Sequence, residues 1–152
     1  MLSGLTGYRA GILPASMMVF ALWAAVAVAG LNDVLIKAAL RGDLAAVKAC
    51  IANGADVNAK DKDGSTALIW ASATGNKEIV QLLLAKKADV NAKDNQGFTA
   101  LMQASAAGYS KVVKLLLANG ADVNAKDKEG WTVLMFASRK KVKKLLIRAG
   151  AK

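Results

Sequence analysis

The sequence predicts an all-α repeat solenoid, because one pattern recurs along the chain at a constant interval. The heptapeptide Ala-Asp-Val-Asn-Ala-Lys-Asp begins at Ala55, Ala88 and Ala121. Each copy continues with Gly-x-Thr-x-Leu and then a cluster of leucines or, in the last copy, Leu-Leu-Ile. A period of this size is typical of small units that bury their apolar faces only by stacking. We therefore expect stacked helix–turn–helix units joined by β-turn or hairpin loops, preceded by an N-terminal hydrophobic helix.

Each element of the first full unit has its own local signal. Asp61–Gly64 is predicted to be a turn, with glycine where the backbone needs a positive φ. Thr66 is the predicted N-cap of a first helix over Ala67–Thr74, and the glycine at position 75 breaks that helix. A second helix is predicted over Lys77–Lys86, where apolar residues recur at helical spacing.

The same signals recur on both sides of this unit. The next copy predicts helices over Thr99–Ala107 and Ser110–Ala118. A partial unit at the N-terminal side predicts helices over Asn32–Leu40 and Leu44–Ala52, separated by a break at Gly42. Because this partial unit has no Val-Asn-Ala turn of its own, we expect it to be the N-terminal cap of the stack.

The last unit is shorter than the others. The interval from Ala121 to the equivalent Ala151 is three residues shorter than the earlier intervals, and alignment places the gap after Ser138. The loss requires either a tighter turn between the two helices or a shorter first helix. Lys143 stands where earlier units have valine, which is typical of an exposed terminal cap.

On these residues the chain resembles the ankyrin repeat family, and in particular bacterial, exported members of it. The family's first helix opens with Thr-Pro-Leu-His, whereas the tetrads beginning at Thr66, Thr99 and Thr132 contain neither proline nor histidine. We therefore expect apolar packing in place of the histidine hydrogen bonds, and a slightly softer stack. The resemblance implies a domain over 30–152, divided into an N-terminal cap (32–54), two repeats (55–87 and 88–120) and a shortened C-terminal repeat (121–152).

The composition argues against an enzyme. The 152 residues include no histidine and one cysteine, which removes the commonest general base, the commonest metal ligand and any internal disulfide. No glycine-rich phosphate loop is present. We expect no cofactor and no metal, and we expect Cys50 to be a small buried apolar residue.

The N-terminal segment, 1–29, predicts a signal peptide. Gly11–Leu31 carries no charge, and Ala27-Val28-Ala29 fits the small-x-small rule for cleavage between Ala29 and Gly30. Cleavage would leave a periplasmic or secreted protein. One alternative is an uncleaved anchor in the inner membrane with the repeats outside the cytoplasm, since about 20 apolar residues can cross a bilayer. Another is a buried helix of a soluble protein.

The resemblance also implies a protein partner on the concave face, at the turn tips and the outward side of the first helices. Aromatic residues at such positions often dominate binding energy, although an aromatic here can also simply pack against its neighbours. By position the candidates are Lys62, Asp63, Ser65, Trp70, Asn95, Gln96, Phe98, Gln103, Lys128, Glu129, Trp131 and Phe136.

The segment Arg139–Lys152 holds seven basic residues and no acidic one, in a chain of net charge +10. This end is either a solubilising cap with cations near a helix C-terminus or a contact for anionic lipid, another polyanion or an acidic partner. We do not expect nucleic acid, because aromatics do not interleave with these lysines.

Together these features predict a monomeric, exported, non-catalytic adaptor. The alternatives are a membrane-anchored docking module with its basic end near the lipid, and an inhibitor or immunity-type binder of an enzyme.

Overall fold

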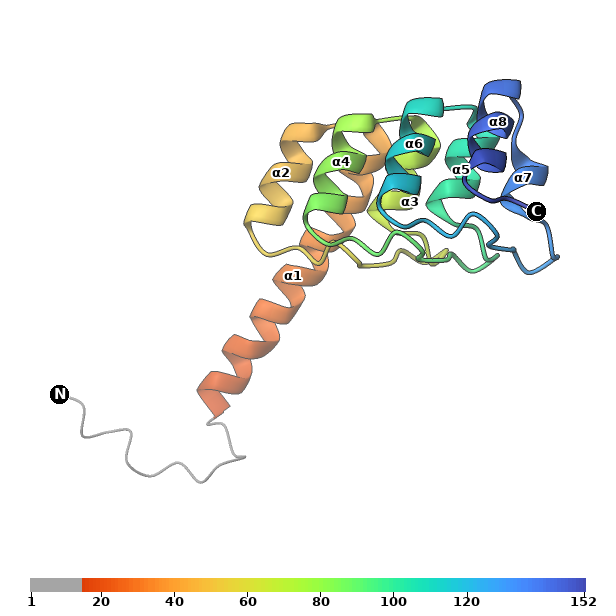
Figure 1. Ribbon diagram of the computed structural model, residues 1–152. Helices are drawn as coiled ribbons and strands as arrows, with labels where there is room; N and C mark the ends of the chain where they lie inside the picture. The colour runs from red at the N-terminus through yellow and green to blue at the C-terminus, as the bar shows by residue number, and fades with distance from the viewer. Residues whose placement is uncertain (1–14) are drawn as a thin grey trace.

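Four helical pairs stack side by side in a single row (Figure 1). The computed structural model describes the backbone of residues 15–152 and the side chains of residues 24–152. The first helices of the pairs pack on one another in one layer, and the second helices form a parallel layer beside it. The first-helix layer contains α1 (Ala15–Arg41), α3 (Ala67–Thr74), α5 (Ala100–Ala107) and α7 (Val133–Phe136). The second-helix layer contains α2 (Leu44–Ala52), α4 (Lys77–Ala85), α6 (Ser110–Ala118) and α8 (Lys140–Arg148).

The helix boundaries of the two full units follow the predicted signals. The Thr66 hydroxyl accepts a hydrogen bond from the Ile69 N–H at 3.3 Å, and Thr99 does the same for Met102, as N-caps should. Gly75 ends α3 in the left-handed region, at φ 76°, which glycine adopts without strain. The predicted second helix over Lys77–Lys86 is one residue too long, because Lys86 is its C-cap.

A ladder of asparagines joins successive units, which the sequence alone did not predict. The Asn58 carboxamide oxygen accepts the Asp89 N–H at 2.7 Å, and Asn91 accepts the Asp122 N–H at 2.7 Å. Asn32 and Asn124 make the corresponding bonds at the two ends, to Asp56 (2.8 Å) and Lys152 (3.0 Å). These are the asparagines of the Val-Asn-Ala turns, together with one from the N-terminal cap, and they supply polar contacts between units.

The core runs continuously through the stack. Ile69 and Met102, which stand where the family has histidine, are both buried, so apolar packing does replace a polar contact at these positions. Cys50 is a buried free thiol, as predicted. Met135 occupies the same position in the last unit but is 63% exposed.

The N-terminal unit differs from the prediction. We expected its first helix to begin at Asn32, but α1 is continuous from Ala15 to Arg41. Gly30 is the only glycine within this run and a single helical glycine costs only about 1 kcal/mol, so nothing in the sequence stops the helix there. Figure 1 shows the N-terminal part of α1 projecting from the stack.

The structure describes only part of the predicted signal peptide or anchor: residues 1–14 lie outside the described residues, and residues 15–29 belong to α1. Within the described part of the chain, no helix combines the length and the apolar character that crossing a bilayer demands.

The last unit is shortened in its first helix. Helix α7 has four residues, whereas α3 and α5 have eight each. The Arg139 side chain lies over Gly108 in the same way that Tyr109 lies over Gly75, so the contact between units is kept at the helix–helix turn. Lys143 is exposed, as expected for a terminal cap.

Candidate partner-binding surface

The turn tips and the first-helix layer together form what we call the inner surface. The turns pair with one another from unit to unit: the Asn95 N–H donates to the Asp63 carbonyl at 2.9 Å, and the Lys128 N–H donates to the Gln96 carbonyl at 3.0 Å. Two isolated antiparallel bridges, Lys60 with Thr66 and Lys126 with Thr132, close individual turns. The candidate residues at these tips are therefore held in register by backbone bonds.

A hollow of about 430 Å³ lies at the C-terminal end of the inner surface, and we call it the aromatic hollow. Phe98 and Phe136 meet edge to face with ring centroids 5.3 Å apart, and Trp131 lies 6.2 Å from Phe136. Six of the residues lining the hollow are predicted candidates, and the seventh, Asp127, was not anticipated. The lining consists of Gln96, Phe98, Asp127, Lys128, Glu129, Trp131 and Phe136.

Asp127 builds the turn that presents Trp131. Its Oδ1 accepts two backbone N–H groups, those of Glu129 and Trp131, each at 2.9 Å. The same bonds occur at Asp94, which accepts from Gln96 and Phe98. These aspartates are thus structural acceptors, and the signal that could have revealed them is their recurrence at each turn. Trp131 remains 49% exposed although its backbone is held.

A second hollow, of about 340 Å³, lies at the N-terminal end of the inner surface. It contains the predicted candidates Lys62 and Trp70 together with α1 residues that the sequence analysis missed: Asp33, Ile36, Lys37 and Leu40. The Trp70 indole N–H donates to Asp61 Oδ2 at 2.8 Å, so its polar edge is already used. The missed residues belong to the cap unit, where no turn motif marked them.

Four predicted candidates lie outside both hollows. Ser65 is buried, at 4% exposure, because its small side chain fits within the turn that its carbonyl closes by accepting the Asp61 N–H. The Asn95 carboxamide N–H donates to the Lys62 carbonyl at 3.1 Å. Asp63 is exposed and Gln103 is half-buried, so both border the surface without lining a hollow.

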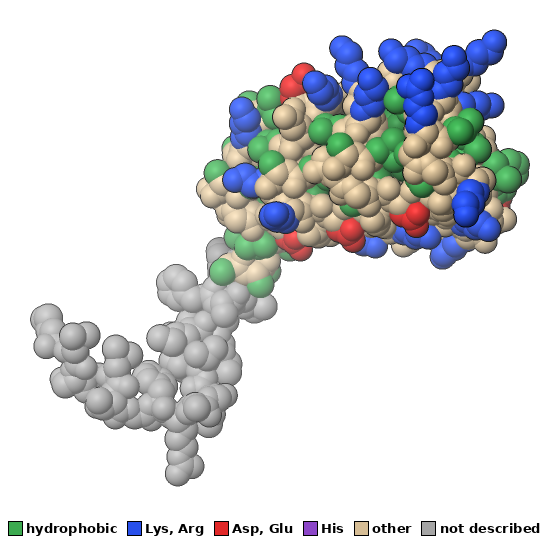
Figure 2. Space-filling model, in the orientation of Figure 1, with side chains coloured by type: hydrophobic (Ala, Val, Ile, Leu, Met, Phe, Trp, Pro, Cys, Tyr) green, Lys and Arg blue, Asp and Glu red, His purple; other side chains and the backbone are tan. Residues whose placement is uncertain are grey.

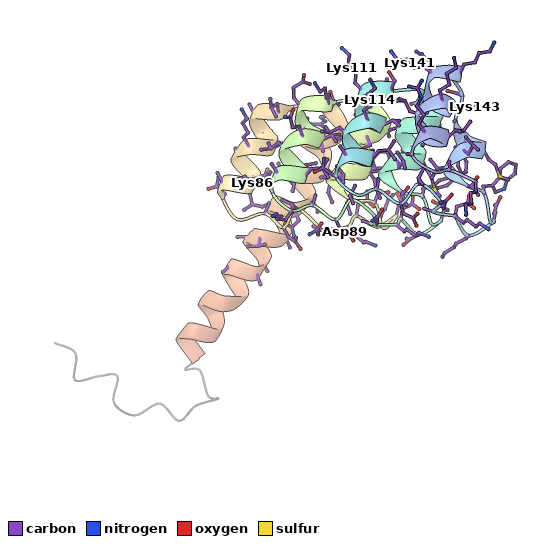
Figure 3. The ribbon with its side chains drawn as sticks, viewed as in Figure 1. Lys86, Asp89, Lys111, Lys114, Lys141 and Lys143 are labelled. Carbon is purple, nitrogen blue, oxygen red and sulfur yellow. The ribbon has the colours of Figure 1, made fainter. Side chains whose placement is uncertain are left out.

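The basic residues collect elsewhere. Figure 2 shows Lys and Arg gathered along the edge above α6 and α8, where the helix pairs turn, on the side away from the Val-Asn-Ala turns. Figure 3 shows Lys111, Lys114 and Lys141 projecting at this edge. One of the two alternatives for this end was a cap with cations near a helix C-terminus. Lys140 and Lys141 occupy the first turn of α8, and Arg148 lies in its last turn. The macrodipole therefore opposes the cations at the start of α8.

Helix α1 leaves the stack on the side of the Val-Asn-Ala turns, opposite to the basic edge (Figures 1 and 2).

Residues of metal-site type do not cluster in the part of the chain that the structure describes: none of its His, Cys, Asp and Glu side chains form a group of three or more. A sequence-family model described as ankyrin repeats, in three copies, matches residues 35–127. A search of the curated proteins gives no match.

Proposed function

Since the chain belongs to the ankyrin repeat family, whose repeats are generally protein-interaction modules, we propose that it holds one protein partner on its inner surface. The observation that carries this proposal is the aromatic hollow, in which Phe98, Phe136 and the exposed Trp131 form an apolar wall beside a polar rim. An apolar recess with a few polar groups at its edge is the usual form of a binding site. The partner's anchor is therefore a large apolar side chain.

The expected energy follows from the exposure of Trp131. A tryptophan side chain presents roughly 200 Å² to water, and about half of it is exposed here. Covering about 100 Å² at about 25 cal/mol/Å² contributes about 2.5 kcal/mol. Truncating Trp131 should therefore weaken binding of the partner by about 60-fold, in the range of an interface hot spot.

The test uses peptides selected from a random library displayed on phage against the full chain. Affinities of the selected peptides for the wild type, Trp131→Ala and Met135→Ala are compared by fluorescence anisotropy. Met135 is the matched control, since it is also apolar and exposed but does not line the hollow. Loss of binding in Trp131→Ala alone supports the proposal. Peptides that tolerate Trp131→Ala would refute it.

We further propose that the chain acts outside the cytoplasm after cleavage between Ala29 and Gly30. Both of these residues are exposed, whereas Leu31 packs against the core and Asn32 bonds to Asp56. Cleavage at this bond would therefore leave every core contact of the described side chains, 24–152, in place. The check is the intact mass of the protein from fractionated host cells. A mass matching residues 30–152 in the soluble exported fraction supports export, and a full-length mass contradicts cleavage.

A further inference from the structure

We propose that a groove between α6 and α8, on the face opposite the inner surface, binds an extended acidic segment of a partner protein. This groove has a volume of about 320 Å³ and is separate from the aromatic hollow. Its lining contains five cationic side chains, one leucine and no carboxylate: Lys114, Lys140, Lys141, Lys144, Leu145 and Arg148. We call it the basic groove.

The cations of the basic groove are unfavourable to the protein on its own. Lys140, Lys144 and Arg148 follow one another at four-residue intervals, and like charges at this spacing destabilise a helix. Helix α4 carries Glu78 in its first turn, but α6 and α8 carry no acidic residue there. A bound anion would offset both the repulsion along α8 and the unfavourable charge at its first turn.

The spacing of the cations matches an extended peptide. Residues four apart on a helix are about 6 Å apart along its axis. In an extended chain, side chains on one face recur at every second residue, about 6.6 Å apart. The three cations along α8 therefore align with carboxylates at alternate positions of a short extended segment. Lys114 faces them from α6, and Leu145, half-buried between the helices, provides an apolar floor.

Two other polyanions fit less well. A membrane surface is broad, whereas these cations line a groove between two helices. Single-stranded nucleic acid is usually held by aromatic side chains on which the bases stack, and no aromatic lines this groove. Charge and spacing together favour an acidic protein segment.

The experiment measures binding of a fluorescein-labelled peptide of five Asp-Thr repeats to the full-length protein. The groove variant is Lys140→Gln with Lys144→Gln, and the matched control is Lys48→Gln with Lys86→Gln. The control removes the same two charges from exposed positions outside the groove. Circular dichroism confirms that both variants keep the helical content of the wild type.

We expect the groove variant to bind the peptide about fivefold more weakly and the control to change by less than twofold. Binding should also weaken strongly between 0.1 M and 1 M salt, because the screening length falls from about 10 Å to about 3 Å. Equal losses of peptide affinity in both variants would show that only the net charge matters, and would overturn the proposal. So would failure to bind the peptide, or groove-dependent binding to phosphatidylserine vesicles or a single-stranded oligonucleotide in preference to the peptide.

Discussion

Lys87 occupies a backbone position that suits glycine, and replacing it should stabilise the stack. It ends α4 with φ 66°, and no other non-glycine residue in the described part of the chain has a positive φ. The equivalent residues of the other units are Gly54, Gly120 and Gly150, with φ between 85° and 96°. The Lys87 N–H bonds to Leu84 and the next N–H bonds to Leu83, as a helix end of this type requires.

The expected gain is a difference between two terms. A non-glycine residue in the left-handed region costs about 1–2 kcal/mol. Lys87→Gly removes this cost. Glycine also raises the conformational entropy of the unfolded chain, which lowers the free energy of unfolding by about 0.4–1 kcal/mol. The net stabilisation is therefore about 0.5–1 kcal/mol. The Lys87 carbonyl still accepts from Asn58, because that contact involves only the backbone of residue 87.

Urea denaturation followed by circular dichroism measures this difference. With a slope of about 2 kcal/mol/M, the midpoint should rise by about 0.4 M. Lys86→Gly is the matched control, since it makes the same chemical change one residue earlier, at φ −90°. It should lower the midpoint, because glycine there gains nothing in the folded state. The reasoning fails if Lys87→Gly leaves the midpoint unchanged or lowers it as much as the control does.

Two further predictions concern contacts between units, and both are measured as free energies of unfolding in urea. Asn91→Ala should cost about 1–2 kcal/mol, because its carboxamide joins two units, whereas Asn119→Ala should cost less, because its carboxamide bonds only within its own helix. Similar costs for the two would show that the asparagine ladder does not couple the units. Gly75→Ala should cost about 2 kcal/mol or more, since an added Cβ would lie 2.8 Å from the Tyr109 ring. Gly120 has a similar φ but open space around it. Equal losses of stability in Gly75→Ala and Gly120→Ala would show that the ring contact is not the cause.

The repeat period was sufficient to predict most of the helices. Helices α2, α3 and α6 have the predicted bounds, because threonine caps, glycine breaks and apolar spacing act over short stretches of the chain. The start of α1 was predicted wrongly. The residues of the N-terminal cap do not show whether the preceding apolar run continues the same helix.

The candidate site was predicted in part. Aligning the repeats identified Phe98, Trp131 and Phe136 as variable surface positions. Only the structure showed that these three lie together, because Phe98 comes from one unit and the other two from the next. Ser65 shows the opposite case: it aligns with Phe98 and Trp131 but is buried, since a small side chain fits within the turn.

The sequence by itself determined the stacked units, the family and the absence of histidine, because these depend on residue identity and spacing along one chain. The tertiary structure decided which charges and rings share a surface. Lys114 and Lys144 belong to different units, yet they line one groove because α6 and α8 pack side by side. Which edge is basic and which hollow is aromatic depend on how neighbouring units stack. Stacking brings together residues about 30 positions apart in the sequence, which is farther than any local sequence pattern extends.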